Sequence, residues 1–274
     1  MDTNKKIIIG AVGAAVVIGA ASIGLILGRA PADTDLSTIH TQTTAAPETT
    51  AATTAAIEST SAAESETVKE ASTGISVQLE TYTSGNISIQ YPVVDQMDDS
   101  EKQSSVNELL KTNALSIIQA NDLDDSKDTL TIKCEVISAD RKRLTAVYKG
   151  DRMNEGAAYP VSIFYTNTVD LNQVRNLGLS DYTDAYTMAG YVLSDDVEFL
   201  GVTQEQKDAF LEYRDTLDLD ILTEVFDGAD FPLASENAWP ESFSYENHGT
   251  ICFSVPVPHA LGDYVIVTFN PSTK

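Results

Sequence analysis

His248 and His259 are the first candidates for chemistry in the part of this 274-residue chain that we expect to fold. A hydrolase would need such a base beside a nucleophile, or a pair of carboxyl groups. The chain has no Gly-x-Ser-x-Gly motif, no His-Glu-x-x-His motif and no glycine-rich phosphate loop. His248 lies in a turn, and His259 lies in a loop at residues 256–262. We therefore expect no enzyme; the alternative is an envelope hydrolase that uses acidic residues and His259.

The chain has two cysteines, Cys134 and Cys252, which could form a disulfide in an exported protein. Alternation places Cys134 on one strand face with Ile132 and Val136, so that it points into the core. Cys252 shares its face with more polar residues. Because free cysteine commonly behaves as a small hydrophobic residue, two buried or half-buried thiols are favoured. A Cys134–Cys252 disulfide remains the alternative.

Residues 121–128, Asn-Asp-Leu-Asp-Asp-Ser-Lys-Asp, place oxygen ligands at alternate positions, as the start of a calcium loop does. The central glycine is missing, and Lys133 occupies the twelfth position counted from Asp122, where a calcium loop has glutamate. A second acidic cluster comprises Asp218, Asp220, Asp227 and Asp230. Neither pattern gives a full ligand set, so we expect no metal site and no cofactor.

The elements that would position these groups follow from the spacing of the apolar residues. Alternation predicts a hairpin at 75–82 and 87–91, and helical spacing after Ser100 predicts an amphipathic helix. Further strands are predicted at 130–136, 144–148, 161–168, 250–255 and 264–269, with mostly helix at 182–226. This order predicts an α+β fold with a largely antiparallel sheet and helices packed on one face.

Residues 7–28 form an uncharged apolar run, preceded by six residues that include Lys5 and Lys6. About 20 apolar residues span the bilayer core as a helix, and basic flanks stay in the cytoplasm. We therefore favour a single-pass anchor in the cell membrane, with the C-terminal domain outside. The alternative is a signal peptide cleaved near residues 30–32, followed by secretion. Gly24 and Gly28 form a Gly-x-x-x-Gly pair, which would suit a helix-mediated dimer.

Residues 29–74 are rich in Thr, Ala, Ser and Glu, a composition that predicts a disordered linker. The expected organisation is a cytoplasmic tail at 1–6, the transmembrane anchor at 7–28, this linker, and an extracytoplasmic domain at 75–271. Beyond residue 29 the chain carries 40 acidic and 14 basic residues, a net charge of −26. Such a surface repels nucleic acid, and it favours cationic partners or solubility alone.

The segment 239–267, WPESFSYENHGTICFSVPVPHALGDYVIV, resembles the closing part of a family of bacterial extracytoplasmic domains. This family occurs in RsiV-type anti-sigma factors and in PdaC-type polysaccharide deacetylases. Its opening phenylalanine, glycine turn and Pro/Ala/Gly loop correspond here to Phe243, Gly249, Ala260 and Gly262. Earlier stretches are also similar to the family, in the order Tyr91-Pro92, Val106-Asn107, residues 156–160 and residues 169–171.

The chain also departs from this family. Tyr159 stands where the family often has histidine, so the role of that histidine does not carry over. Six residues before the apolar run form no sigma-binding region, and no deacetylase domain follows residue 274. The resemblance implies a binding or sensing module, which in RsiV-type proteins recognises lysozyme, and it implies no catalytic residues.

The leading expectation is a module at the cell envelope that binds or senses a cationic protein such as lysozyme, or cell-wall glycan. We place its binding edge in two loops, because loops on a rigid sheet often carry recognition. The expected binding residues are Gly156, Tyr159, Pro160, Pro258, His259 and Gly262. Ordinary strand connections are the alternative for these loops, and a structural assembly component is the third hypothesis for the protein.

Overall fold

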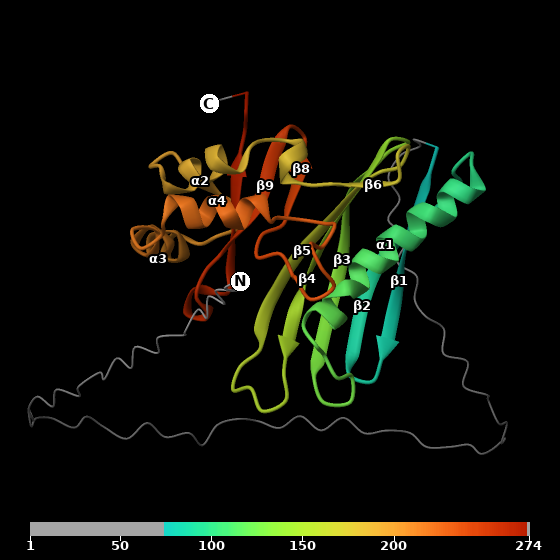
Figure 1. The fold of residues 1–274 in the computed structure, drawn as a ribbon, viewed down its shortest axis with the longest axis horizontal. Coiled ribbons are helices and arrows are strands. Elements are labelled where there is room, and N and C mark those ends of the chain that lie inside the picture. Colours follow the sequence, from blue (N-terminus) through green and yellow to red (C-terminus); the bar gives the residue numbers. More distant parts are fainter. Residues whose placement is uncertain (1–73, 273–274) are drawn as a thin grey trace, which may run out of the picture. The chain divides into compact units, whose positions relative to one another are not determined.

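The computed structural model describes residues 74–272 (Figure 1). The expected cytoplasmic tail, the anchor and the linker up to residue 73 lie outside the described residues. Within residues 74–272, every helix is too short or too polar to cross a membrane. The described residues correspond to the domain expected at 75–271.

A six-stranded sheet forms the larger part of the fold. Its strands lie in sequence order: β1 (Ser76–Ser84), β2 (Ile87–Asp95), β3 (Thr129–Ala139), β4 (Arg143–Met153), β5 (Val161–Asp170) and β6 (Arg175–Leu177). Neighbours pair antiparallel except β2 and β3, which are parallel. A parallel pair needs a long crossover connection, and helix α1 (Ser100–Ala120) supplies it.

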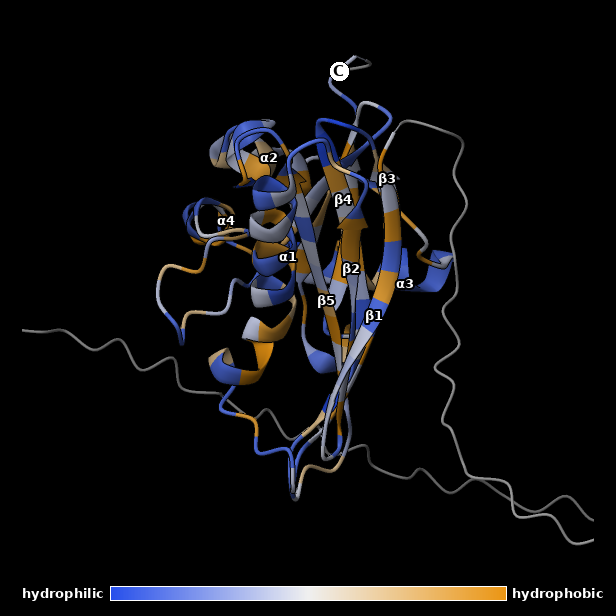
Figure 2. Cartoon of the chain, turned by 90° about the vertical axis from the view of Figure 1, so that its right-hand side faces the viewer, coloured by the Kyte–Doolittle hydropathy of each residue, from blue (hydrophilic) through white to orange (hydrophobic). Residues whose placement is uncertain are grey.

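Helix α1 covers one face of this sheet. Asp99 caps the helix, because its side chain accepts hydrogen bonds from the backbone N–H groups of Glu101 and Lys102, at 3.0 Å each. The buried residues Val106, Leu110, Asn113, Ala114 and Ile117 lie at helical spacing on its inner side. The Tyr165 hydroxyl on β5 donates to the Ala114 carbonyl at 2.9 Å, which fixes the helix over the sheet. In Figure 2, α1 lies to the left of the strands, along one side of the sheet.

A second, four-stranded sheet has the order β7-β10-β9-β8 and is antiparallel throughout. Its strands are β7 (Glu198–Phe199), β8 (Ser244–Asn247), β9 (Thr250–Pro256) and β10 (Tyr264–Phe269). Helices α2 (Ala185–Leu193), α3 (Gln204–Arg214) and α4 (Leu219–Asp227) accompany it, together with the short 3-10 helices η1 (Leu179–Asp181) and η2 (His259–Leu261).

Strand β9 is buried on both faces. Phe253 packs against Phe226 of α4, with ring centroids 5.2 Å apart, whereas Cys252 belongs to the core of the six-stranded sheet. On the neighbouring strand β10, Tyr264 contacts Phe164 of β5, at 5.2 Å between ring centroids. The four-stranded sheet therefore lies between the six-stranded sheet and the helices α2, α3 and α4 (Figure 1). The layers run from α1 through two sheets to these three helices.

The α+β class is confirmed, but the expectation of one sheet with helices on one face is wrong. Two sheets pack face to face, and the helices lie on the two outer sides. The sequence did not show this because β9 is buried on both faces from Ile251 to Val255, including the polar Ser254. A run buried on both faces gives no alternation from which to assign its partners.

Candidate functional site

Two loops that lie about one hundred positions apart in the sequence meet at one surface. The first, residues 154–160, joins β4 to β5, and the second, residues 257–263, joins β9 to β10 and contains η2. The ring centroids of Tyr159 and His259 lie 6.2 Å apart. Tyr159 is 71% exposed, the highest value for a large hydrophobic side chain among the described residues. We call this area, with the six expected binding residues and Asp263, the paired-loop surface.

Asp263 fixes the loop 257–263 against β5. Its Oδ1 lies 2.9 Å from Nδ1 of His259, and its Oδ2 accepts a hydrogen bond from the backbone N–H of Ser162 on β5, at 2.7 Å. Its backbone carbonyl accepts from Val257 at 3.0 Å. One carboxylate thus orients the imidazole and ties its loop to the other sheet. This pairing leaves the second ring nitrogen of His259 available at the surface.

Backbone conformation explains the glycines of this surface. Gly262 ends η2 with φ of 100°, and Asp263 follows with φ of 71°. Gly156 has φ of 78° in the other loop. Glycine adopts positive φ without the steric cost that a Cβ atom brings. Pro258 caps η2, and Pro160 directly precedes β5. The structure therefore brings all six expected residues into two neighbouring loops.

A hollow of about 290 Å³ adjoins the paired-loop surface and includes Gly262 and Leu261 in its wall. Aromatic side chains of both sheets, Phe164, Tyr245 and Tyr264, form part of this wall, and Lys149 and Gln206 provide polar groups. Burial raises the pKa of Tyr245 and of Tyr264, so both phenols stay protonated and can donate hydrogen bonds at neutral pH. The hollow offers an apolar wall with a few polar groups, as ligand sites usually do.

Several of these residues had no recognisable signal in the sequence. Asp263 is a single acidic residue in a strongly acidic chain, and only the structure shows that it connects His259 to β5. Leu200 and Gln206 belong to the hollow because α3 follows β7, a two-residue strand defined by its pairing with β10. Such a short strand has no pattern of its own.

His259 does not form a recognisable catalytic group in the described residues. Nδ1 of its imidazole is hydrogen-bonded to Asp263, and no hydroxyl or thiol within residues 74–272 is hydrogen-bonded to its Nε2. An oriented imidazole beside an exposed tyrosine can stack, donate and accept hydrogen bonds.

The acidic clusters have structural roles. Asp124 accepts hydrogen bonds from Ser126, and Asp128 accepts from the backbone N–H groups of Asp124 and Glu155. These hydrogen bonds lower the pKa of both carboxyl groups. Asp218 caps α4. Within residues 74–272, no group of three or more His, Cys, Asp or Glu residues is placed to hold a metal ion.

Asp230 is the buried member of the second acidic cluster. The sequence placed Asp230 in an acidic cluster without a full ligand set, and the structure shows that its carboxyl group is buried between the two sheets. It accepts hydrogen bonds from the backbone N–H and the hydroxyl of Ser244, both at 2.6 Å, and from the N–H of Leu179 at 2.8 Å. Burial, opposed by these hydrogen bonds, raises its pKa to about 6.

The six-stranded sheet itself separates the two thiols. Cys134 on β3 lies opposite Tyr148 on β4, and Tyr148 lies opposite Tyr165 on β5. The rings of these two tyrosines stack with centroids 4.4 Å apart, beneath α1. Cys252 lies on β9, in the layer between the two sheets. Both are free, buried thiols, and burial raises the pKa of Cys134 to about 12.

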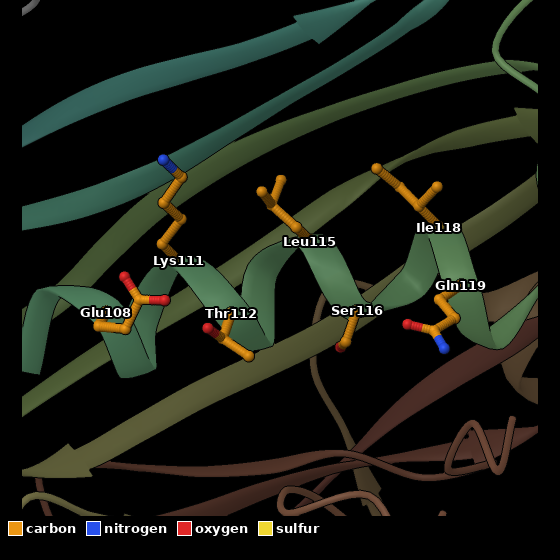
Figure 3. Close-up of a pocket in the computed structure, with 7 residues that line it drawn as sticks. All are labelled: Glu108, Lys111, Thr112, Leu115, Ser116, Ile118 and Gln119. Atoms are coloured by element: carbon orange, nitrogen blue, oxygen red, sulfur yellow. The ribbon is translucent and has the colours of Figure 1, made fainter. Parts of the chain in front are cut away.

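A second hollow, of about 400 Å³, lies on the outer side of α1 (Figure 3). Its lining residues are Glu108, Lys111, Thr112, Leu115, Ser116, Ile118 and Gln119. In Figure 3, Lys111, Leu115 and Ile118 project to one side of the helix and the other four project to the opposite side. Side chains of one helix that diverge in this way do not converge on a ligand, so the paired-loop surface is the better candidate.

Comparison with known proteins gives likenesses at the level of structure alone. No family model matches the sequence, and no curated protein matches it. A solved structure of a DUF3298 family member from Bacteroides fragilis is similar with a TM-score of 0.40 and 14% identity, over 73% of this chain and 92% of that chain. A DUF3298 family protein from Pseudomonas aeruginosa is similar with a TM-score of 0.33 and 10% identity, over 70% of this chain and 81% of that chain. The solved structures to which this chain is similar thus include two proteins of the DUF3298 family.

Proposed function

We propose that this protein is a binding module of the bacterial cell envelope that recognises a cationic protein through the paired-loop surface. The observation that carries the proposal is the meeting of Tyr159 and His259 from two separate loops. Aromatic side chains are enriched in protein interfaces, where tyrosine supplies a large contact area at low entropic cost. Recognition does not require a nucleophile, and none is hydrogen-bonded to His259 in residues 74–272.

The charge of the chain favours a cationic partner. Beyond residue 29 the acidic residues outnumber the basic ones by 26, and such a field attracts and orients a basic protein. The motif resemblance to RsiV-type and PdaC-type domains points to lysozyme as the specific protein to test. In this proposal the apolar segment 7–28 anchors the protein, and residues 29–74 hold the domain away from the membrane.

Cell-wall glycan is the second candidate ligand, because the hollow beside the paired-loop surface has an aromatic wall. Sugar rings present apolar faces that aromatic side chains can contact, and hydroxyl groups that Lys149, Gln206 and the two buried phenols can bind. The hollow of about 290 Å³ is near the lower limit of common ligand pockets. It would hold one short part of a glycan.

Retention of the full-length protein on immobilised lysozyme and on insoluble peptidoglycan tests both candidates. We expect the Tyr159→Ala variant to lose about tenfold or more in affinity, because exposed aromatic anchors often contribute 1–3 kcal/mol. Tyr186→Ala is the matched control, since Tyr186 is 61% exposed on α2 and lies outside the paired-loop surface. Absence of wild-type binding to both materials, at low and at moderate salt, would exclude this function.

The hydrolase hypothesis requires a separate measurement. Incubation of the protein with peptidoglycan, followed by analysis of released fragments, detects hydrolysis directly. Release of fragments by the wild type but not by His259→Ala would replace the binding proposal with an enzymatic one. The third hypothesis, an assembly component held by Gly24 and Gly28, predicts that substitution of this pair changes the oligomeric state.

A further inference from the structure

The two sheets have four edges in the described part of the chain, and these edges differ in length. Strands β1 and β6 border the six-stranded sheet, and β7 and β8 border the four-stranded sheet. The strands β6, β7 and β8 have three, two and four residues, whereas β1 has nine. Short edge strands are one of the ways in which proteins prevent unwanted strand pairing. Among the described strands, β1 is therefore the long open edge.

Strand β1 also lacks the other features that protect an edge. Its register with β2 is continuous from Ser76–Asp95 to Ser84–Ile87, so no bulge bends it away. It contains no proline and no lysine, and its one charged residue is Glu80. The Glu80 side chain accepts a hydrogen bond from the Tyr91 hydroxyl at 2.9 Å and so remains beside its own sheet. A regular, nearly uncharged edge of this kind is suited to strand addition.

We propose that β1 pairs antiparallel with β1 of a second copy of this chain, about a twofold axis at Leu79. Alternate residues of an edge strand direct their backbone groups outward. In a symmetric antiparallel pair, residues that direct these groups outward must face each other. An even-numbered residue therefore faces an even-numbered residue of the other copy, and an odd-numbered residue faces an odd-numbered one. With the axis at Leu79, Val77 faces Thr81 of the other copy, and Gln78 faces Glu80.

Side-chain chemistry selects this axis over the neighbouring one at Glu80. That axis would place two Glu80 carboxylates directly opposite each other, and like charges at opposed strand positions are destabilising. At the Leu79 axis, each Gln78 amide can donate a hydrogen bond to the carboxylate of the partner's Glu80. Both of these side chains are exposed, and because the Tyr91 hydroxyl is bound to Oε2 of Glu80, Oε1 can accept the hydrogen bond from the partner's Gln78.

Charge also explains why a second copy would meet this edge. The chain has a formal net charge of −24, so most of its surface repels another copy of itself. The β1 edge, with one carboxylate among nine residues, is a place where that repulsion is small. One added strand pair buries less than the roughly 1,200 Å² of a standard stable interface. The dimer is accordingly weak and forms at high local concentration.

Sedimentation of the full-length protein in detergent, over a wide range of concentration, tests this pairing. We expect a monomer–dimer equilibrium in the wild type. Gln78→Glu creates two opposed carboxylate pairs across the axis, so it should raise the dimer dissociation constant about tenfold. The double variant Gln78→Glu/Glu80→Gln restores one amide opposite each carboxylate and should return the constant to near the wild-type value.

Thr131→Glu is the matched control, because Thr131 is exposed but lies on β3, inside the sheet, and the change adds the same charge. Circular dichroism of each variant verifies that the fold is intact. A wild type that stays monomeric at every concentration overturns the proposal. Equal weakening of the dimer by Gln78→Glu and by Thr131→Glu also overturns it. Failure of the double variant to restore the dissociation constant of the wild type would do the same.

Discussion

The buried carboxyl group of Asp230 connects three parts of the chain that are far apart in sequence. It accepts hydrogen bonds from Leu179 beside η1 and from Ser244 on β8, and Thr166 of β5 lies 3.4 Å from its Oδ1. Its backbone has φ of 66°, a conformation that is uncommon outside glycine. A Cβ atom added at Gly178 would lie 2.8 Å from the Cβ atom of Asp230. The packing around Asp230 is thus specific to this side chain.

Ionisation of Asp230 should make the protein less stable as the pH rises. Its pKa in the folded state, about 6, lies above the ordinary value of 3.8, so the fold favours the protonated acid. The stabilisation is complete below pH 3.8 and is lost as the pH rises through 6. A difference of about two pKa units corresponds to about 3 kcal/mol.

Asp230→Asn measures this effect, since the amide does not titrate. The free energy of unfolding of the wild type minus that of the variant, from urea titrations, should fall by about 2 kcal/mol between pH 4 and pH 7, because the carboxyl group of the unfolded chain is already more than half ionised at pH 4. Subtraction removes the contribution of other titrating groups. A difference that is independent of pH would show that Asp230 ionises without cost in the fold.

At the scale of elements, helix α1 depends on its N-cap. Asp99→Ala removes the acceptor for two backbone N–H groups and should lower the free energy of unfolding by about 1 kcal/mol. Asp98→Ala, one residue earlier and also exposed, is the control, and thermal or urea unfolding of both variants is the measurement. Equal effects of the two substitutions would show that the loss arises from charge and not from capping.

The elements that could be predicted are those whose pattern is local. The β1–β2 hairpin and α1 were expected within a few residues of their observed bounds, because alternation and helical spacing are set by a single buried face. Strands β6 and β8 were missed, and the helical region 182–226 contains three helices with β7 before the second. These short strands exist through pairing with distant partners, which no local pattern encodes. For the same reason, the two loops could be chosen by composition, but their contact could not be foreseen.

At the scale of the whole molecule, the six-stranded sheet keeps the two thiols apart. We expect a thiol reagent to label neither Cys134 nor Cys252 in the native protein and to label both after denaturation without reductant. The physical reason is burial of both side chains and the raised pKa of both thiols, since thiolate is the reactive form. Absence of labelling after denaturation would mean that the thiols are oxidised.

The position of β10 has a consequence for biosynthesis. This strand lies between β7 and β9 in the second sheet, yet it comes after both of them in the sequence. Chains are made from the N-terminus, and early segments can fold while later ones are still missing. The six-stranded sheet can assemble during synthesis, whereas β7 has no partner, and His259 no Asp263, until residues 263–269 have been made. The contacts that orient His259 and pair β7 therefore form only after β10 has been made.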